Sequence, residues 1–192
     1  CASGEKDVDI MNKPQLILKA IKENLIPLTQ KEVAAGNHVF GGLVLDKESC
    51  RVITAGSNNR QANPIYHGEI DTIQRFFADG GHPNPADCIF VASHDPCSMC
   101  ISAISWAGFH EIWVLFGYDD VEKEFGMPVD IMMYKEVFGA EGATDYNKFF
   151  RKYYLKKEAA KQENAAELRK EIAEIEKLYG EMRVEDFDYP GM

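Results

Sequence analysis

Two apolar runs, each followed by a helical pattern, constrain the fold of this chain more than any other feature. CIFVAS (88–93) and EIWVLFGY (111–118) have the composition of strands that are buried on both faces of a sheet. Helical patterns follow at 97–108 and 129–139, and each of them ends at a glycine. Strands that are connected by helical crossovers run parallel, and the helices cover the sheet. The sequence therefore predicts an α/β architecture.

The residues before these runs predict an antiparallel strand pair and two more helices. FGGLVLD (40–46) and RVITAGS (51–57) are short strand patterns joined by a turn, as in a hairpin. A helix is expected over 13–36, and Pro27 should bend or break it. Another is expected over 67–79, before a stretch rich in glycine and proline. Together these elements predict a three-layer α/β/α domain with a mixed sheet.

A change of composition near residue 150 divides the chain into three predicted parts. These are a polar N-terminal tail (1–12), the α/β domain (13–150) and a charged helical C-terminal extension (151–192). A long helix rich in Ala, Glu and Lys, with opposite charges four residues apart, is expected from about 144 to 180. It has one narrow apolar face, which packs either on its own domain or on another subunit. That face consists of Leu168, Ile172, Ile175 and Leu178.

Bulk composition limits the partners of the chain. Its 192 residues, 45% of them hydrophobic, suffice for one domain with a core, and no apolar run reaches the length of about 20 residues that a bilayer requires. The net charge of −10 makes long nucleic acid an unfavourable partner. Five cysteines without a dense framework argue against a disulfide-stapled secreted protein, so a cytoplasmic location is expected. The start at Cys1 indicates a trimmed tag or leader, or alternatively a lipoprotein anchored through that cysteine.

Two cysteines in HDPCSMC form the first half of a predicted metal site. Cys97 and Cys100 are three residues apart, so a helix presents both sulfurs on one face. Pro96 marks the first turn of that helix, where the dipole favours thiolates. A lone pair of this kind is equally compatible with a redox or a structural role.

A histidine and a glutamate in YHGEIDTIQRFF supply the second half. His67 also lies at the start of a helix, and it can meet Cys97 and Cys100 if both helices begin at one edge of the sheet. Three protein ligands leave one position of a zinc ion open for water, which is typical of catalytic sites. Glu69, two residues on, is placed to accept a proton from that water. The pair of motifs H-x-E and P-C-x-x-C characterises zinc deaminases.

On these motifs the chain resembles the cytidine deaminase-like superfamily over roughly residues 14–150. It is most similar to the single-domain branch that includes guanine deaminase, fungal cytosine deaminase and the tRNA adenosine deaminases. HGE is similar to the cytosine enzyme, whereas FGGLVLD, GSNNR, SAISWAG and MMYKEV are similar to guanine deaminase. The resemblance implies a sheet of about five strands, a homodimer and one Zn²⁺ per chain. It makes His67, Cys97 and Cys100 the metal ligands and Glu69 the proton shuttle.

The same resemblance suggests which residues contact the substrate. It gives Asn58 the role of hydrogen-bonding the substrate ring, and it places Asp120 near a substrate-contacting aspartate of guanine deaminases. Phe40 is a candidate for the pocket wall, with a plain core position as the alternative. Tyr66 stands where relatives carry a small residue, so it is a candidate for substrate choice. In guanine deaminases the C-terminal end caps a partner's site, which makes Phe187 and Tyr189 candidates here.

One further residue departs from the family pattern, and the tryptophans and the remaining histidines have expected positions in the fold. Asp95 stands before Pro96 where the family usually has glutamate. Trp106 and Trp113 lie on apolar stretches and are expected in the core. The other histidines lie near turns or element ends and are expected at surface or capping positions, with His94 nearest to the site. These are His38, His82, His94 and His110.

Three functional hypotheses follow. The leading one is a zinc-dependent hydrolytic deaminase of a free nucleobase or a related small amino-heterocycle, of guanine or cytosine type, releasing ammonia. The second is a tRNA adenosine deaminase, which the acidic charge disfavours. The third is a catalytically silent, zinc-stabilised interaction protein, for which Glu69 would have no use.

Overall fold

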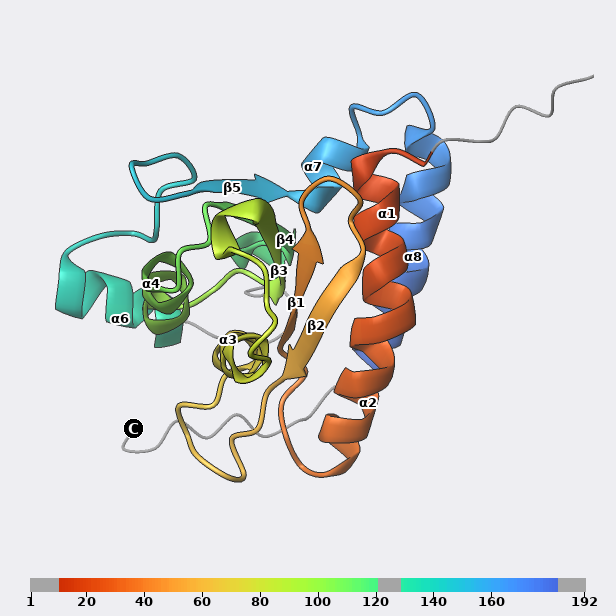
Figure 1. Cartoon of the computed structure of the whole chain (residues 1–192). Helices are drawn as coiled ribbons and strands as arrows, with labels where there is room; N and C mark the ends of the chain where they lie inside the picture. The colour runs from red at the N-terminus through yellow and green to blue at the C-terminus, as the bar shows by residue number, and fades with distance from the viewer. Residues whose placement is uncertain (1–10, 121–128, 183–192) are drawn as a thin grey trace, which may run out of the picture.

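The computed structural model describes residues 11–120 and 129–182, which form a five-stranded mixed sheet between two helical layers (Figure 1). The strand order is β2-β1-β3-β4-β5, and β1 pairs antiparallel with both of its neighbours. The pairs β3–β4 and β4–β5 are parallel. The predicted three-layer fold with a mixed sheet is therefore confirmed. The strands are β1 (Gly41–Asp46), β2 (Val52–Ser57), β3 (Cys88–His94), β4 (Glu111–Phe116) and β5 (Arg151–Tyr154).

The described helices cover both faces of the sheet. In Figure 1, α1, α2 and α8 lie on one face, and α3, α4 and α6 lie on the other. The helical segments are α1 (Lys13–Ala20), a π-helical turn (Ile21–Leu25), α2 (Ile26–Ala34), α3 (Gly68–Ala78), a 3₁₀ turn (Pro85–Asp87), α4 (Ser98–Trp106), α6 (Val129–Phe138), α7 (Leu155–Ala159) and α8 (Ala165–Glu181).

Pro27 does not break the first helical stretch, which was one of its two predicted effects. The turn before it is π-helical, so the N–H of Ile26 donates to the carbonyl of Ile21, five residues back. Pro27 then falls in the first turn of α2, where a missing N–H costs little. The stretch from Lys13 to Ala34 therefore continues as one wall of the core.

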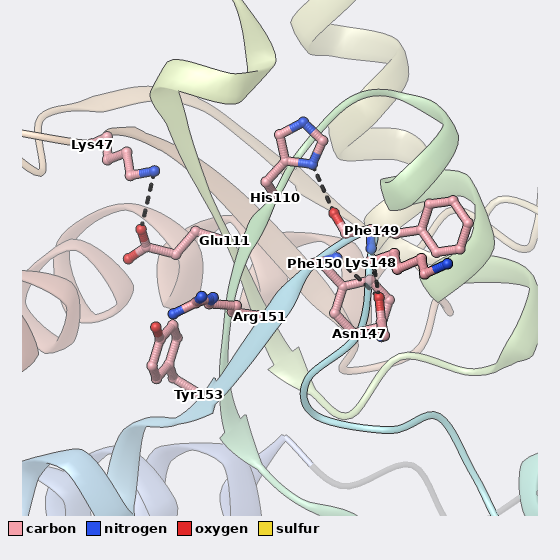
Figure 2. Close-up of a pocket in the computed structure, with 9 residues that line it drawn as sticks. All are labelled: Lys47, His110, Glu111, Asn147, Lys148, Phe149, Phe150, Arg151 and Tyr153. Carbon is pink, nitrogen blue, oxygen red and sulfur yellow. Dashed lines mark hydrogen bonds and ion pairs between the residues drawn. The ribbon is translucent and has the colours of Figure 1, made fainter.

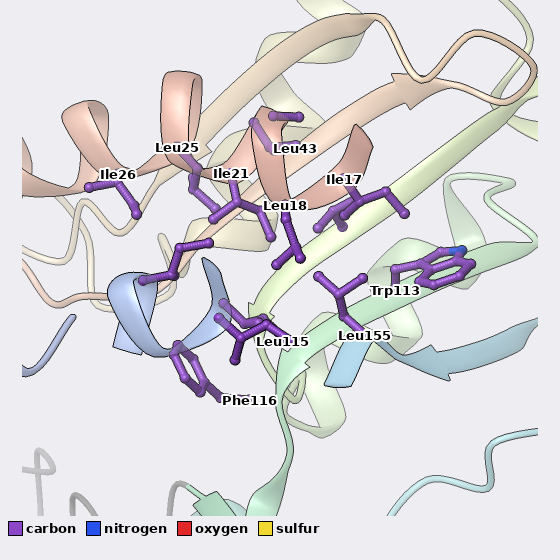
Figure 3. Close-up of a cluster of buried hydrophobic side chains, with 14 of the residues drawn as sticks. Ile17, Leu18, Ile21, Leu25, Ile26, Leu43, Trp113, Leu115, Phe116 and Leu155 are labelled. Carbon is purple, nitrogen blue, oxygen red and sulfur yellow. The ribbon is translucent and has the colours of Figure 1, made fainter. Parts of the chain in front are cut away.

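Each face of the sheet has its own hydrophobic core. Side chains alternate along the strands, so Leu43 and Leu45 of β1 join one core and Val44 joins the other. The core shown in Figure 3 contains Ile17, Ile21 and Leu25 against Leu115 and Phe116 of β4. The second core packs α3 and α4 onto the other face through Phe76, Ile101 and Ile104.

The segment after residue 150 differs from the prediction at its start. Residues 151–154, placed in the helical extension, form the edge strand β5, and the long helix begins at Ala165 instead of near 144. β5 lacks an apolar run because an edge strand has one neighbour only, and its buried side chain is a lysine, Lys152. The sheet thus extends past the boundary suggested by composition.

Helix α8 packs on its own domain, which was one of the two alternatives. Leu168, Ile172 and Ile175 are buried in the same core as α1. Tyr179, four residues after Ile175, is also buried there, and the predicted Leu178 is partly buried against the same core.

Several predictions of burial need correction. Trp106, expected in the core, is 92% exposed at the last residue of α4, whereas Trp113 is buried as expected. His38 and His94, expected at surface or capping positions, are buried. None of the described helices has the length and apolar character to span a membrane. Cys1, Phe187 and Tyr189 lie outside the described residues.

Candidate metal centre

Glycines bring the first turn of α3 unusually close to the sheet. A Cβ at Gly68 would lie 2.4 Å from the carbonyl oxygen of Phe40 and 2.5 Å from the Cα of Gly41. A Cβ at Gly56 on β2 would lie 2.4 Å from the backbone N of Thr72. Only residues without a Cβ permit this approach. The glycine inside HGE thus fixes the position of the two candidate site residues beside it, His67 and Glu69.

The first turn of α4 is fixed to the ends of β3 and β4. Cys97 is the N-cap of α4, and Cys100 lies in its first turn. The preceding residue pair is held from both sides, because Asp95 N donates to the carbonyl of Phe116 (2.8 Å) and the Tyr118 hydroxyl donates to the carbonyl of Pro96 (3.0 Å). The helix that carries the two thiols therefore begins at a fixed position beside the C-terminal ends of β3 and β4.

His67, Cys97 and Cys100 come together between the two helix starts. His67 Nδ1 lies 3.6 Å from each Sγ, and the three donor atoms all lie within 4.8 Å of one another. One imidazole nitrogen and two thiol sulfurs form a donor set that suits zinc, and three protein ligands leave a coordination position open. The donor chemistry and spacing of this cluster fit a metal ion.

Charges within the cluster favour metal binding. Hydrogen bonding from Cys100, and then from His67, lowers the pKa of Cys97 to about 4 despite burial. Burial opposes protonation of His67, but the hydrogen bond and charge of Cys97 raise its pKa to about 9. Burial raises the pKa of Cys100 well above its ordinary value. In the metal-free cluster His67 is therefore an imidazolium, Cys97 a thiolate and Cys100 a thiol. Binding of a metal ion to these three donors releases protons.

Glu69 is a buried carboxyl group beside this cluster. Its side chain is on the first turn of α3, and the residue is 6% exposed. Burial, followed by the charge of Cys97, raises the pKa of Glu69 to about 7. A group with a pKa near neutrality can both accept and return a proton.

The orientation of the Asn58 side-chain amide is defined by hydrogen bonds to its oxygen. Its Oδ1 accepts hydrogen bonds from the backbone N–H groups of His38 (3.3 Å) and Arg60 (3.2 Å). Its own N–H donates to the carbonyl of Phe40 (2.8 Å). Because a backbone N–H can only donate, Oδ1 is identified, and the NH₂ group is the end available to a ligand.

The other predicted substrate residues lie in different settings. The ring of Phe40 is partly buried and meets that of His94 edge-on, 4.8 Å between centroids. Tyr66 is partly buried, and its backbone bonds to Asn59 and Asn63 shape the loop before His67.

Asp120 is engaged elsewhere. Its carboxylate accepts from Gly117 N (3.1 Å) and pairs with Lys156 (3.2 Å), and neither contact involves the cluster.

Sequence reasoning missed Asp130, an acidic residue near the cluster. It is partly buried in the first turn of α6, and burial, then the charge of Cys97, raises its pKa to about 6. Its charge in turn raises the pKa of His67. An acid at a helix start is common because it complements the helix dipole, so the sequence held no signal that set Asp130 apart.

A cavity of about 450 Å³ lies elsewhere, at the edge of the sheet where β4 and β5 begin (Figure 2). None of its lining residues belongs to the cluster. The donor set and the buried carboxyl group, rather than cavity size, locate the candidate site at the helix starts of α3 and α4.

Comparison with known families agrees with this location. Residues 18–116 match the family described as the cytidine and deoxycytidylate deaminase zinc-binding region, and the chain belongs to this family. The match spans both helix starts and ends with β4.

Individual relatives cover only part of the chain. It is 32% identical over 98 residues to guanine deaminase of Bacillus subtilis (strain 168), covering 50% of this chain and 61% of that protein. A probable cytosine deaminase of Schizosaccharomyces pombe (strain 972 / ATCC 24843) is 25% identical over 92 residues, covering 48% of this chain and 54% of that protein. The chain thus spans between half and two thirds of these curated relatives.

Solved structures share the fold. The X-ray structure of guanine deaminase from Bacillus subtilis has 27% identity and a TM-score of 0.53, covering 66% of this chain and 77% of that one. A crystal structure in complex with 2,6-diaminopurine has 20% identity and a TM-score of 0.55, covering 89% and 85%.

Proposed function

We propose that this protein is a zinc-dependent hydrolytic deaminase that acts on a free nucleobase or a related small amino-heterocycle and releases ammonia. The observation that carries the proposal is the buried Glu69, with a pKa of about 7, beside a three-donor cluster. A purely structural zinc site usually has four protein ligands and no neighbouring acid of this kind. Family membership supports the same chemistry.

His67, Cys97 and Cys100 would hold one zinc ion per chain. Zinc there supplies an activated water for attack on the ring carbon that bears the amino group. The Glu69 carboxylate takes one proton from the attacking water and delivers it to the ring nitrogen. It then takes the second proton from the hydroxyl group now on the ring carbon and delivers it to the amino group, which leaves as ammonia as the carbonyl forms. Asn58 donates through its NH₂ group to an acceptor on the ring and fixes its orientation.

We assign substrate choice to the groups around the cluster. The Asp130 carboxylate is an acceptor, so it favours a ring edge that presents N–H donors, such as that of guanine. Asp120 is less suited to this role because Gly117 and Lys156 engage it. Phe40 and Tyr66 would form apolar walls. Guanine- and cytosine-deaminating relatives, and the diaminopurine complex, support a free base as substrate.

Ammonia release by the zinc-loaded protein tests the proposal. Guanine, cytosine, adenine, their nucleosides and triazines form the panel, and Glu69→Gln should lower turnover by about 10²- to 10⁴-fold without loss of zinc. Glu167→Gln, at an exposed carboxylate on α8, is the control and should behave as wild type. Absence of turnover on the whole panel, with one zinc bound per chain, would refute the proposal.

The two other hypotheses make different predictions. A tRNA adenosine deaminase would bind tRNA with an affinity that falls steeply with salt, which the net charge of −10 disfavours. A silent interaction protein would lose neither a reaction nor ligand affinity on Glu69→Gln.

We also propose a cytoplasmic homodimer. Trp106 on α4 and Val137 and Phe138 on α6 are exposed apolar side chains on the helical layer that carries the cluster, and they would form the subunit contact. Thiolate ligands at Cys97 and Cys100 suit a reducing compartment. Light scattering on Trp106→Glu should show a shift from dimer to monomer, and an unchanged mass would remove this surface from consideration.

A further inference from the structure

The cavity lies where β4 and β5 begin, at the opposite end of the strands from the metal centre, and it combines basic and aromatic side chains. Lys47, Lys148 and Arg151 line it together with His110, Phe149 and Tyr153 (Figure 2). These residues come from the β1–β2 turn, the start of β4, the segment that leads into β5 and β5 itself. Its volume of about 450 Å³ falls within the usual range for small-molecule sites, roughly 300–1,000 Å³.

The segment beside this cavity is strongly basic in an otherwise acidic chain. Residues 146–157 (YNKFFRKYYLKK) contain five cations and no acid, although the chain has a net charge of −10. Lys152 and Lys156 are neutralised by ion pairs with acidic residues. Lys148 and Arg151 are exposed and pair with no carboxylate in the described part of the chain. These two cations are therefore available to an anion.

The one acidic group in the cavity is already neutralised. Glu111 is approached by Lys13 (3.2 Å) and Lys47 (3.6 Å), and it accepts a hydrogen bond from Trp113 Nε1 (2.9 Å). One carboxylate shared by two lysines leaves a positive charge at this side of the cavity. Repulsion of an anionic ligand by Glu111 is thereby offset.

The backbone of an exposed aromatic residue, Phe149, is anchored in this cavity, and in Figure 2 its ring lies on the same side as Lys148, whereas Arg151 lies on the other side beside Tyr153. Phe149 is 66% exposed, yet its backbone is fixed. Asn147 Oδ1 accepts from the N–H groups of Phe149 (2.8 Å) and Phe150 (3.0 Å), and His110 Nδ1 donates to the carbonyl of Phe149 (2.7 Å). A ligand that stacks on this ring orders little additional backbone, so the cost of binding is small.

We propose that this cavity binds a nucleoside monophosphate. Arg151 offers a planar fork of donors that matches phosphate, and Lys148, on the Phe149 side of the cavity, adds positive charge. The Phe149 ring offers a stacking surface for a base, and stacking between basic side chains is how proteins hold nucleotides without reading their sequence. The net charge of −10 favours a free nucleotide over the end of an RNA strand, which presents the same chemistry.

This cavity is separate from the metal centre. It lies where β4 begins, whereas the cluster lies where β3 and β4 end. The five steps between the six residues of β4 span roughly 17 Å at about 3.3 Å per step. Both sites can therefore be filled together, and the inference does not depend on the deaminase proposal.

Calorimetric titration of the metal-loaded full chain with AMP, GMP and CMP tests the proposal. Saturable binding is expected, together with weakening by about tenfold or more in Arg151→Gln, since a charged hydrogen bond is lost. Phe149→Ser should weaken binding of the nucleotides but not of inorganic phosphate. Lys170→Gln, at an exposed lysine on α8, is the matched control and should bind as wild type.

Two outcomes would overturn the proposal. One is the absence of binding at millimolar nucleotide, and the other is equal affinity in Arg151→Gln and Lys170→Gln. A 5′-phosphorylated oligoribonucleotide distinguishes the two sources of the ligand. Tighter binding than the mononucleotide that still requires Arg151 would assign the same cavity to an RNA end, whereas binding independent of Arg151 would count against the cavity.

Discussion

Lys152 Nζ lies 2.8 Å from Asp95 Oδ1, and both side chains are 2% exposed. The second oxygen, Asp95 Oδ2, accepts a hydrogen bond from the Tyr154 hydroxyl (2.8 Å). Asp95 comes two residues before the cluster residue Cys97, so a buried ion pair connects the edge strand β5 to the start of α4. The carboxylate that departs from the family pattern is thus fully satisfied by two residues of β5.

Removing the lysine from this pair should be strongly destabilising. Lys152→Met leaves Asp95 charged and buried, and we expect a loss of about 3–5 kcal/mol in the free energy of unfolding. Lys152→Met/Asp95→Asn removes both charges and should recover most of that loss. Urea unfolding measures both variants, and equal stability of the single and double variants would contradict a role for the pair. Lys22→Met, at an exposed ion pair with Glu174, should leave the free energy of unfolding nearly unchanged.

Two glycine-to-alanine substitutions should change the free energy of unfolding in opposite directions. In Gly68→Ala the new Cβ would overlap the backbone of Phe40 and Gly41, so α3 must move and His67 with it. We expect several-fold weaker zinc retention against a chelator and a loss of stability of about 1–3 kcal/mol. Gly180→Ala in α8 meets no atom within 4 Å and should gain about 0.4–1 kcal/mol. Unaltered zinc retention in Gly68→Ala would show that the close approach is not required.

Removal of the metal should reveal a difference in reactivity toward alkylation between two equally buried thiols. Cys97 and Cys50 are each 6% exposed, but hydrogen bonds from Cys100 and His67 lower the pKa of Cys97 to about 4, whereas burial raises that of Cys50. At pH 6 the chelated protein should be alkylated by iodoacetamide at Cys97 first, as followed by peptide mass spectrometry. Zinc should protect Cys97 but not Cys50. Equal labelling of the two thiols after chelation would argue against a thiolate at Cys97.

Acid should destabilise the protein partly through His94. Burial, and then the charge of Lys156, lowers its pKa to about 3, while an unfolded histidine titrates near 6.5. The unfolded chain therefore takes up a proton that the folded chain refuses. The stability from neutral His94 is complete above pH 6.5 and is lost as the pH falls toward 3, by up to about 1.4 kcal/mol per pH unit.

Unfolding of the metal-free protein across this pH range measures the effect without competition for metal ligands. His94→Gln should flatten the dependence, and His82→Gln, at a ring in the loop after α3, should keep it. Parallel curves for His94→Gln and wild type would assign the acid sensitivity to other groups.

The sequence predicted the layers and the cluster because both rest on strong local patterns. CIFVAS is buried on both faces as β3, and His67, Cys97 and Cys100 come together in space with Glu69 beside them. The features that the sequence did not predict depend on contacts between residues that are far apart in the chain. RKYY forms β5 because Lys152 finds Asp95, which lies 57 residues away in the chain. Asp130 lies near the cluster without any local pattern that marks it, while Asp120, the residue suggested by the family resemblance, pairs with Lys156.

The antiparallel pairing of β1 with β3 has a kinetic consequence for the cluster. His67 is seated by the β1–β2 hairpin, whereas Cys97 and Cys100 arrive with β3, so the donor atoms meet only after these two units have docked. A metal ion then recognises a late, nearly native arrangement. It should act as a latch that slows unfolding and leaves the folding rate almost unchanged. The lifetime of the folded chain, more than its speed of assembly, would then depend on the zinc supply of its surroundings.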